Sequence, residues 1–411
     1  MSKVKYIYVS TLKYDGGVYQ TQIIDWLKLY RQNGLDFELV QLFSVGYLLQ
    51  GNYCRTQKKA IRKAAGNIVS FYYTLPPMKV LRLLNNWLFY KRMKRHLKGN
   101  DKLVVFSRAD IGNEMAFLKR KLRGQVVYFY YDLRGAIVAE KLHNIQVSNG
   151  YSLSEYYKVA DTAYSEYFRQ KIADKIFVVS KALKRYFINN YQSSEEKFVL
   201  YPCLSSREKF YYDEAVRERM REQLGYSKQD VVFIYSGGIY NSYHVPDTFV
   251  RLFKHFKLLK ENAKLLVLVK QSTSAFEELV KKDELLKGCV TIKEAVPNNE
   301  VVNYLNAADF GFLLRENITL NNVAFPSKFA EYMLCGLPTI ITASLFDCSE
   351  YCTEHHSGYV LTNEVYEHID DSDFTPLFSQ QFDRRHIANE AEKYLSKESQ
   401  AERIVKQLKT E

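Results

Sequence analysis

Short apolar runs alternate with amphipathic stretches along the first half of the chain. Runs that resemble buried strands lie at 6–10, 37–42, 102–106, 125–131 and 175–180. Helical patterns of hydrophobic positions follow several of them, for example from Tyr19 to about Asn33. Near-continuous apolar strands that alternate with helices are typical of a parallel sheet covered on both faces. We therefore expect a doubly wound α/β domain in this half.

A second series of the same kind follows a polar stretch at 225–230. Its strand-like runs lie at 231–235, 264–269, 290–292, 310–314 and 339–341. The sequence thus predicts two Rossmann-like domains, an N-terminal one over 1–204 and a C-terminal one over 205–384. We expect a central cleft between them, because ligands favour such interfaces. The last helical stretch, 385–411, is expected to return to the first domain.

Composition agrees with a soluble globular protein. The 411 residues are 47% hydrophobic and 25% charged, and no run approaches the roughly 18 apolar residues of a membrane-spanning helix. The first ten residues pass from two lysines into a strand pattern, unlike a signal peptide. Together with six scattered cysteines, this predicts a cytoplasmic protein with reduced thiols. Cys348 and Cys352 match no common zinc spacing, and a reduced pair in a loop is the favoured interpretation over a metal site.

The positive charge is concentrated in one segment. Lys and Arg number 58 against 46 for Asp and Glu, a net charge of +12, and no acidic residue lies between Glu38 and Asp101. Within it, 76–98 has the pattern of a basic amphipathic helix, typical of elements that bind anionic membrane surfaces. The predicted membrane or acceptor face comprises Arg82, Trp87, Lys91, Arg92, Lys94 and Arg95. The alternative is a helix packed on its own sheet whose last turn is basic; both can hold at once.

A segment at 313–338 carries candidate anion-binding groups. Pro326 suits a first helical turn, and a helix over 327–335 would direct its positive end and its first N–H groups, beginning with Ser327, at the cleft. Arg315 and Lys328 would add fixed charge for a diphosphate, and Glu331 is placed to accept two sugar hydroxyls. The alternative is an ordinary amphipathic helix on which Lys328 and Glu331 form a solvated pair.

This segment resembles the donor-nucleotide motif of retaining GT-B glycosyltransferases of family 4, in the branch common among capsule and O-antigen enzymes. The resemblance rests on Arg315 and on the run Ala-Phe-Pro-Ser-Lys-Phe-Ala-Glu-Tyr that contains Lys328 and Glu331. It implies a GT-B fold, a nucleoside-diphosphate-sugar donor with UDP favoured, and neither a metal nor a further cofactor. The earlier acidic residue of the family pattern falls at Val323, and Asn321 and Asn322 are the nearest polar substitutes.

Two glycine turns follow strands. Gly237 and Gly238 resemble the Tyr-Ser-Gly loop of the same family, where backbone N–H groups approach a phosphate; a plain turn is the alternative. The chain departs from the family at 241–244, and Lys270 could supply a replacement cation at the end of the next strand. Gly16 and Gly17 are as consistent with a plain turn as with a ligand loop. The resemblance implies that they line the cleft.

Charged residues also end the central strands of the first domain. Asp132, Arg134 and Glu140 resemble a D-x-R-G-(four)-E motif of that branch, and Arg108 matches its upstream element. Asp132 is the candidate for orienting or deprotonating an acceptor hydroxyl, with Arg134 stabilising charge. An Asp–Arg pair that braces a loop is the alternative. Same-face attack, in which the leaving phosphate takes the proton, would require no dedicated base.

These motifs together predict a retaining glycosyltransferase on the inner face of the cell membrane, acting on a lipid-linked or surface-polysaccharide acceptor. A non-catalytic GT-B subunit that supports a partner transferase is the first alternative. A nucleic-acid-binding protein is the second. It is disfavoured because the chain shows no nucleic-acid module and confines its charge to one segment.

Overall fold

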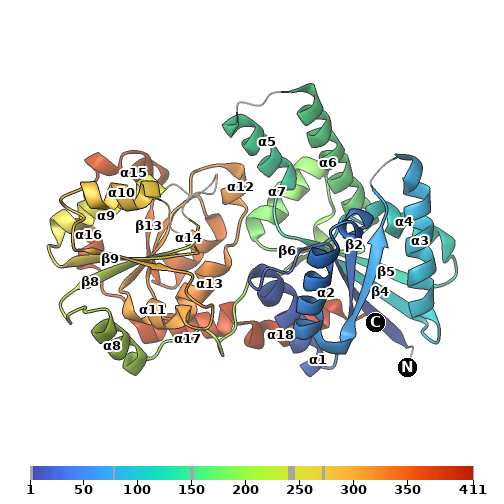
Figure 1. The fold of residues 1–411 in the computed structure, drawn as a ribbon, viewed down its shortest axis with the longest axis horizontal. Coiled ribbons are helices and arrows are strands. Elements are labelled where there is room, and N and C mark those ends of the chain that lie inside the picture. Colours follow the sequence, from blue (N-terminus) through green and yellow to red (C-terminus); the bar gives the residue numbers. More distant parts are fainter. Residues whose placement is uncertain (1–2, 77–78, 149–151, 239–245, 271–273, 411) are drawn as a thin grey trace. The chain divides into compact units, whose positions relative to one another are not determined.

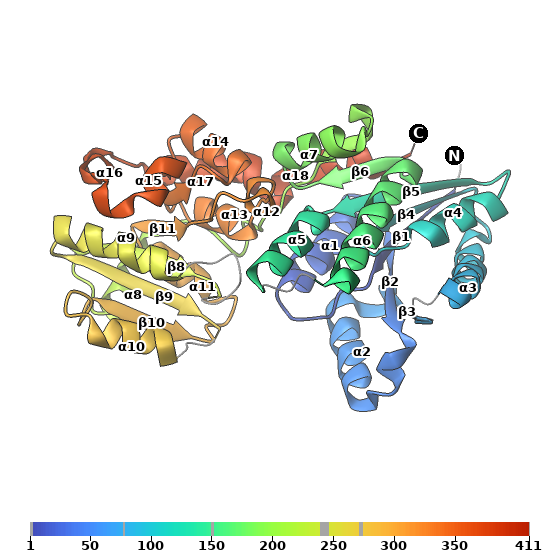
Figure 2. The same cartoon turned by 90° about the horizontal axis from the view of Figure 1, so that it is seen from above.

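The computed structural model describes residues 3–76, 79–148, 152–238, 246–270 and 274–410. The chain forms two compact units, one of residues 1–201 with 401–411 and one of residues 202–400 (Figures 1 and 2). Each contains a parallel sheet with α-helices, so both are α/β units of the Rossmann type.

The described part of the first unit contains a seven-stranded parallel sheet in the order β3-β2-β1-β4-β5-β6-β7. Its strands are β1 (Val4–Ser10), β2 (Phe37–Ser44), β3 (Val69–Thr74), β4 (Lys102–Ser107), β5 (Val126–Leu133), β6 (Lys175–Val178) and β7 (Phe198–Leu200). Strand order reverses between β1 and β4, the position at which such sheets bind ligands beyond the carboxyl ends of their strands. The buried ring of Phe106 anchors the core, 4.8 Å from Phe177 and 5.2 Å from Tyr8 between centroids.

Helices connect these strands. They are α1 (Asp25–Gln32), which continues a π-helical turn at Gln20–Ile24, α2 (Gly51–Ala65), α3 (Lys79–Leu97), α4 (Gly112–Lys121), α5 (Ile137–Val147), α6 (Leu153–Ile172) and α7 (Lys181–Tyr191). The last helix of the chain, α18 (Lys397–Leu408), places its second half in this unit. None of the helices in the described residues is both long and apolar enough to cross a membrane.

In the second unit, the described residues form a six-stranded parallel sheet in the order β10-β9-β8-β11-β12-β13. The strands are β8 (Val231–Ser236), β9 (Ala263–Val269), β10 (Val290–Glu294), β11 (Phe310–Leu313), β12 (Thr339–Thr342) and β13 (Gly358–Leu361). The helices are α8 (Glu214–Gln223), α9 (Pro246–Leu259), α10 (Ser274–Lys282), α11 (Val301–Ala307), α12 (Thr319–Asn322), α13 (Ser327–Leu334), α14 (Phe346–Glu354), α15 (Asn363–Glu367), α16 (Thr375–Ser379) and α17 (Arg384–Leu395). Phe233, Phe256 and Phe312 stack at the centre of the core.

The unit boundaries differ from the predicted ones. The first crossing lies between Tyr201 and Pro202 rather than at 204/205. The predicted return of 385–411 is wrong in its first part, because α17 packs against α13 and stays in the second unit. Only residues 401–411 rejoin the first unit, so α18 belongs to both.

Candidate functional site

Helix α13 is fixed at both ends by local geometry. Pro326 precedes it in an extended conformation (φ −66°, ψ 135°), and no side chain caps the N-terminal turn. At the other end Gly336 adopts φ +59°, which lets its N–H donate to Met333 O and the N–H of Leu337 donate to Tyr332 O, each at 2.9 Å. This Schellman ending satisfies the last carbonyl groups, and the uncapped N-terminus keeps its partial positive charge.

The glycine loop after β8 lies against Lys328 of α13. A Cβ atom at Gly237 would overlap Lys328 Nζ, so the backbone of this loop and the lysine ammonium group lie very close together. Tyr235 joins the same group, because its hydroxyl donates to Gly238 O at 2.6 Å and its ring centroid lies 6.0 Å from Lys328 Nζ. The structure thus brings Gly237, Gly238 and Lys328 together, as the motifs predict for the donor site.

Arg315 is a buried cation of the same unit. It follows β11, and its N–H donates to Thr342 Oγ1 at 3.0 Å, while Ser344 Oγ donates to Arg315 O at 2.8 Å. Its Nη1 donates to Leu314 O at 3.0 Å. Sequence reasoning missed Thr342 and Ser344. Thr342 ends strand β12 and Ser344 follows it, and this position at the ligand-binding edge of a parallel sheet was the available signal.

The charges in this region are unbalanced. Burial lowers the pKa of Lys328 to about 8, the nearby Arg315 guanidinium lowers it too, and Glu331 opposes the shift. Burial also raises the pKa of Glu331. Lys328, the buried Lys397 and a hydrogen bond from Ser327 each lower it, but burial is the larger effect. Cations held together in a low-dielectric site repel one another, and a bound anion relieves that repulsion. The cluster is therefore suited to a diphosphate. Lys397, on the last helix, gave no signal in the sequence.

Two other residues predicted for the donor site, Asn321 and Asn322, make hydrogen bonds to backbone carbonyl groups. Asn321 is buried and its Nδ2 donates to Glu316 O at 3.0 Å. The Asn322 carboxamide, turned so that its nitrogen faces acceptors, donates to Ser344 O at 3.0 Å. Both brace the loop that follows Arg315. Lys270 is exposed after β9 and is not among the charges that shift the pKa of Lys328. The predicted departure at 241–244 lies outside the described residues.

In the first unit, Asp132 lies at the centre of a buried cluster. Its Oδ2 accepts from Tyr8 Oη at 2.8 Å and from Arg108 Nε at 2.9 Å, and its Oδ1 accepts from Arg134 Nε at 2.5 Å. Arg134 also stacks on the ring of Tyr201, with its guanidinium carbon 4.2 Å from the ring centroid. The structure thus brings Asp132, Arg108 and Arg134 together at the carboxyl edges of β4 and β5.

The environment of Asp132 bears on its predicted role as a base. Burial raises its pKa, but Arg108 and Arg134 outweigh burial, and the pKa lies below the ordinary value. Its side chain has no exposed surface. A carboxylate that holds three donors and resists protonation is a poor proton acceptor, so the geometry favours the bracing alternative. Glu140 is half-buried in the first turn of α5.

The loop at Gly16 and Gly17 is closed by its own neighbour. Gly16 has φ +71°, and Asp15 Oδ1 accepts from the N–H of Gly17 at 3.0 Å and of Tyr19 at 3.2 Å. This geometry is that of a plain turn that starts a helix. The loop belongs to the first unit and Lys328 to the second, so a site shared between them stays a prediction.

The basic helix α3 is only partly as predicted. Phe89, Met93 and Leu97 are buried, and the helix packs on α4. Its first half exposes a second apolar side made of Val80, Leu83, Leu84 and Trp87. The predicted cations Arg82, Lys91, Lys94 and Arg95 are exposed, and Lys91 Nζ lies 5.2 Å from the Trp87 ring. The prediction is wrong for Arg92, which does not belong to the exposed cations: it points inward, and its Nη1 donates to Tyr73 O at 2.8 Å.

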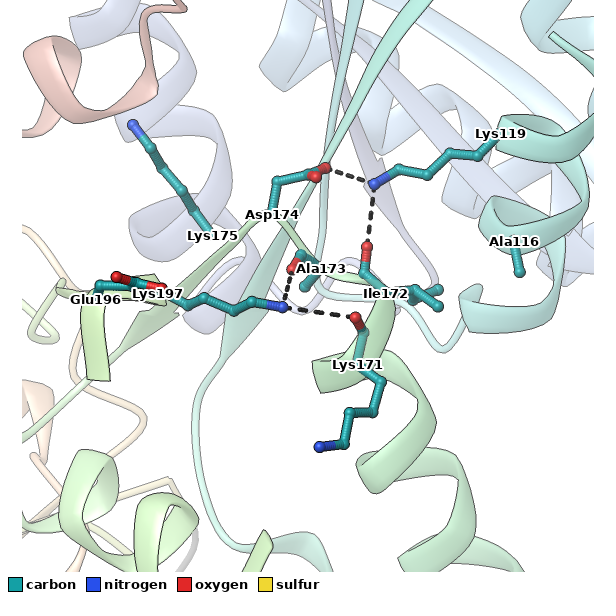
Figure 3. Close-up of a pocket in the computed structure, with 9 residues that line it drawn as sticks. All are labelled: Ala116, Lys119, Lys171, Ile172, Ala173, Asp174, Lys175, Glu196 and Lys197. Atoms are coloured by element: carbon teal, nitrogen blue, oxygen red, sulfur yellow. Dashed lines mark hydrogen bonds and ion pairs between the residues drawn. The ribbon is translucent and has the colours of Figure 1, made fainter. Parts of the chain in front are cut away.

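A cavity of about 660 Å³ lies where α6 ends and β6 begins (Figure 3). Lysines line it, but Lys119 Nζ donates to Ile172 O and to Asp174, and Lys197 Nζ donates to Ala173 O at 3.0 Å. These ammonium groups satisfy the last carbonyls of α6, a common arrangement at helix C-termini. No predicted site residue lines this cavity.

The cysteine pair lies on a helix rather than in the predicted loop. Cys348 and Cys352 are buried free thiols of α14, and burial raises the pKa of both. Across the described part of the chain, no three His, Cys, Asp or Glu side chains gather in a way that could hold a metal ion.

Solved structures share the whole architecture. A glycosyltransferase from Rickettsia africae is 15% identical, with 99% of each chain covered and a TM-score of 0.67. HepE from Anabaena, solved with UDP and glucose, is 13% identical, with 99% of each chain covered and a TM-score of 0.63. WaaG, a glycosyltransferase involved in lipopolysaccharide biosynthesis, is 16% identical, with 99% of this chain and 100% of that one covered and a TM-score of 0.61.

The chain has two Rossmann-like units, each with a parallel sheet, and its fold matches these glycosyltransferase structures. It therefore has the GT-B fold. Residues 216–394 match the family described as "Glycosyl transferases group 1". The match covers less than half of the chain and lies within the second unit of this GT-B protein. No curated protein matches the sequence.

Proposed function

We propose that the protein is a retaining glycosyltransferase that moves a sugar from a nucleoside-diphosphate sugar, with UDP favoured, to an acceptor hydroxyl. The observation that carries this proposal is the contact between the Gly237 loop and Lys328, with Arg315 among the charges on Lys328, inside the domain that matches the family. The structures of HepE with UDP and with UDP-glucose support the choice of nucleotide.

The proposed chemistry follows from the charges. Arg315, Lys328 and the N-terminus of α13 would hold the diphosphate and stabilise the negative charge that develops as the sugar bond breaks. Glu331 would accept hydrogen bonds from the ribose hydroxyls. The acceptor hydroxyl would attack on the same face, and the leaving phosphate would take its proton. No metal is required in this proposal, because the fixed cations supply the charge.

The acceptor is proposed to be lipid-linked or a growing surface polysaccharide, reached from the cytoplasmic face of the membrane. The exposed apolar side of α3 with its four exposed cations supports this location. Each basic residue near an anionic leaflet contributes about 1 kcal/mol, and an exposed tryptophan suits the interface. Sedimentation with anionic vesicles should retain the protein, and Leu83→Asp with Trp87→Ala should release it. Leu258→Asp, on the exposed side of α9, is the matched control.

The donor site is tested by titrating UDP, GDP, ADP and CMP without metal, followed by turnover of the corresponding nucleotide sugars. Saturable binding of one nucleoside diphosphate is expected, and Lys328→Ala and Glu331→Ala should each weaken it strongly. Lys282→Ala, an exposed lysine of α10, should not. Absence of binding to all four would refute the donor site. Binding without turnover of any nucleotide sugar would indicate a non-catalytic subunit.

A further inference from the structure

The turn between β2 and α2 exposes three large apolar side chains within six residues. Leu48 and Leu49 keep 55% and 92% of their surface in solvent, and Tyr53, in the first turn of α2, keeps 39%. Leu49 is the most exposed large hydrophobic side chain in the part of the chain that the structure describes. We define the leucine tip as Leu48, Leu49 and Tyr53. Exposed apolar side chains that gather in this way, rather than lying singly, indicate an interaction surface.

The leucine tip lies at the carboxyl edge of the first sheet, as does the exposed side of α3. Strands β2 and β3 pair in parallel with Ser44 opposite Thr74, so both end at the same edge. The tip begins four residues after β2 ends, and α3 begins five residues after β3 ends. Figure 2 shows α2 and α3 on either side of β3. The tip and the first half of α3, which exposes Leu83, Leu84 and Trp87, therefore leave the sheet at the same edge.

Exposed cations accompany the leucine tip. Lys13 Nζ lies 5.8 Å from the Tyr53 ring centroid. No acidic residue occurs between Glu38 and Asp101, and Glu38 already pairs with Lys5 and His96. Helix α2 exposes four further cations, Arg55, Lys59, Arg62 and Lys63. In the described part of the chain no ion pair joins these four to a carboxylate, so their charge is available to an anionic partner.

We propose that the leucine tip inserts into the interface of an anionic lipid bilayer, so that the carboxyl edge of the first sheet faces the membrane. Apolar side chains that enter the boundary between headgroups and acyl chains, with cations beside them, are the combination by which peripheral proteins bind anionic leaflets. A soluble polyanion would engage the cations but leave Leu49 in water. This orientation rests on the membrane location proposed above, and it adds a second contact, on a different element from α3.

The orientation bears on the acceptor. Strand order in this sheet reverses between β1 and β4, and ligands of such sheets bind beyond the carboxyl ends of the strands there. Asp132, Arg108 and Arg134 lie at the same edge. An acceptor whose lipid stays in the bilayer would present its polar head to this edge without leaving the membrane. The surface therefore favours an amphiphilic, lipid-linked acceptor over a soluble glycan.

The depth of the leucine tip is measured with an environment-sensitive fluorophore on Leu49→Cys in the full chain. Vesicles that contain phosphatidylglycerol should shift its emission to shorter wavelength, and nitroxide-labelled acyl chains should quench it. Val126→Cys, at the exposed first residue of β5 on the opposite edge of the sheet, is the matched control and should show neither change. Leu84→Cys reports the contact made by α3. Labelled wild type gives the background, since its cysteines are buried or half-buried.

The pattern of responses separates the two contacts. A response at position 84 without one at position 49 would overturn the leucine tip and leave the membrane location intact. Absence of a response at both positions would contradict the tip and the membrane location together. An equal response at position 126 would show nonspecific adsorption and would also overturn the orientation.

A second experiment removes the apolar contact without changing the charge. Leu48→Ser with Leu49→Ser should weaken vesicle binding about tenfold or more, because the two leucines no longer leave water, and should bind dextran sulfate like wild type. Leu258→Ser with Leu259→Ser, another adjacent pair of exposed leucines on α9, is the matched control and should bind vesicles like wild type. Vesicle binding that survives the loss of Leu48 and Leu49 would overturn the insertion. Retention on dextran sulfate without any binding to vesicles would do so too, and would identify a soluble polyanion as the partner.

Discussion

At the scale of single residues, the structure turns ordinary side chains into specialised ones through burial. Lys328 would be a typical solvated lysine at an exposed position, but its pKa is lowered to about 8 by burial and by Arg315. The ammonium group is charged below its pKa and neutral above it. Its attraction for a diphosphate is therefore present at neutral pH and lost as the pH rises through about 8.

This lowered pKa predicts a pH dependence of donor binding. The affinity for the nucleoside diphosphate that binds should decrease between pH 7 and pH 9 as Lys328 loses its proton. Calorimetric titrations at several pH values measure it. Lys328→Ala should bind weakly at every pH and lose the dependence, whereas Lys282→Ala should retain both. A constant wild-type affinity over this range would exclude Lys328 as the group responsible.

The Asp132 carboxylate contributes to stability through its ion pairs with Arg108 and Arg134. Asp132→Asn removes a fully buried carboxylate and leaves two half-buried guanidinium groups without it, so the first unit should lose about 3–5 kcal/mol of unfolding free energy. Tyr8→Phe removes one hydrogen bond and should cost only about 1 kcal/mol. Urea unfolding followed by tryptophan fluorescence measures this, because both tryptophans, Trp26 and Trp87, lie in the first unit. Equal losses for the two variants would contradict the bracing role.

At the scale of elements, the backbone at the end of α13 is tightly constrained. Gly336 combines φ +59° with a position where a Cβ would clash with Arg384 O. Arg384 in turn donates to carbonyl groups of residues that follow α11 and α13 in the chain, including Ala308 O at 2.7 Å and Gly336 O at 3.0 Å. The arginine therefore ties together the ends of two helices of the second unit.

Alanine substitutions at two glycines distinguish the steric clash with Arg384 from the cost of a positive φ. Gly336→Ala should destabilise the second unit by well over 1 kcal/mol, because it adds a steric conflict to an unfavourable φ. Gly225→Ala has a similar φ of +71° with nothing near the added Cβ, and should cost about 1 kcal/mol. Thermal unfolding of the two variants gives the comparison. A smaller loss for Gly336→Ala than for Gly225→Ala would show that Arg384 is not a rigid neighbour.

Sequence patterns predict elements whose apolar residues are contiguous, and miss those whose burial depends on neighbours. The central strands β1, β4, β8 and β9 are apolar runs in the sequence and are buried strands in the structure. Strand β3 was not predicted, because it lies at a sheet edge and all six residues are only half-buried. Helix α6 escaped notice because its aromatic side faces solvent. The motif at 313–338 located Arg315 and Lys328, whereas Lys397 reaches their region through tertiary packing alone.

At the scale of the whole molecule, the chain passes between its two units twice. Ser205 and α18 are joined beside the second crossing, where Lys397 N donates to Ser205 O at 2.8 Å. Beyond Gln400, Ala401, Ile404 and Leu408 are buried in the first unit. The short C-terminal segment is thus part of the core formed by the N-terminal half of the chain.

Truncation tests this dependence. A chain that ends after Gln400 loses several buried apolar side chains, each contributing on the order of 2–5 kcal/mol, so the first unit should unfold at much lower urea. A chain that ends after Leu408 keeps them and should behave like wild type. Tryptophan fluorescence again follows the first unit. Equal midpoints for the two truncations would show that α18 does not support it.

The shared helix α18 also sets rules for recombination. The simplest hybrid of two GT-B proteins would exchange their halves at a single junction near the middle of the gene. For this chain such a junction would pair residues 1–201 of one parent with residues 401–411 of another, inside one hydrophobic core. A working chimera therefore needs two junctions, one at 201/202 and one within α18, so that the eleven terminal residues travel with the half they complete.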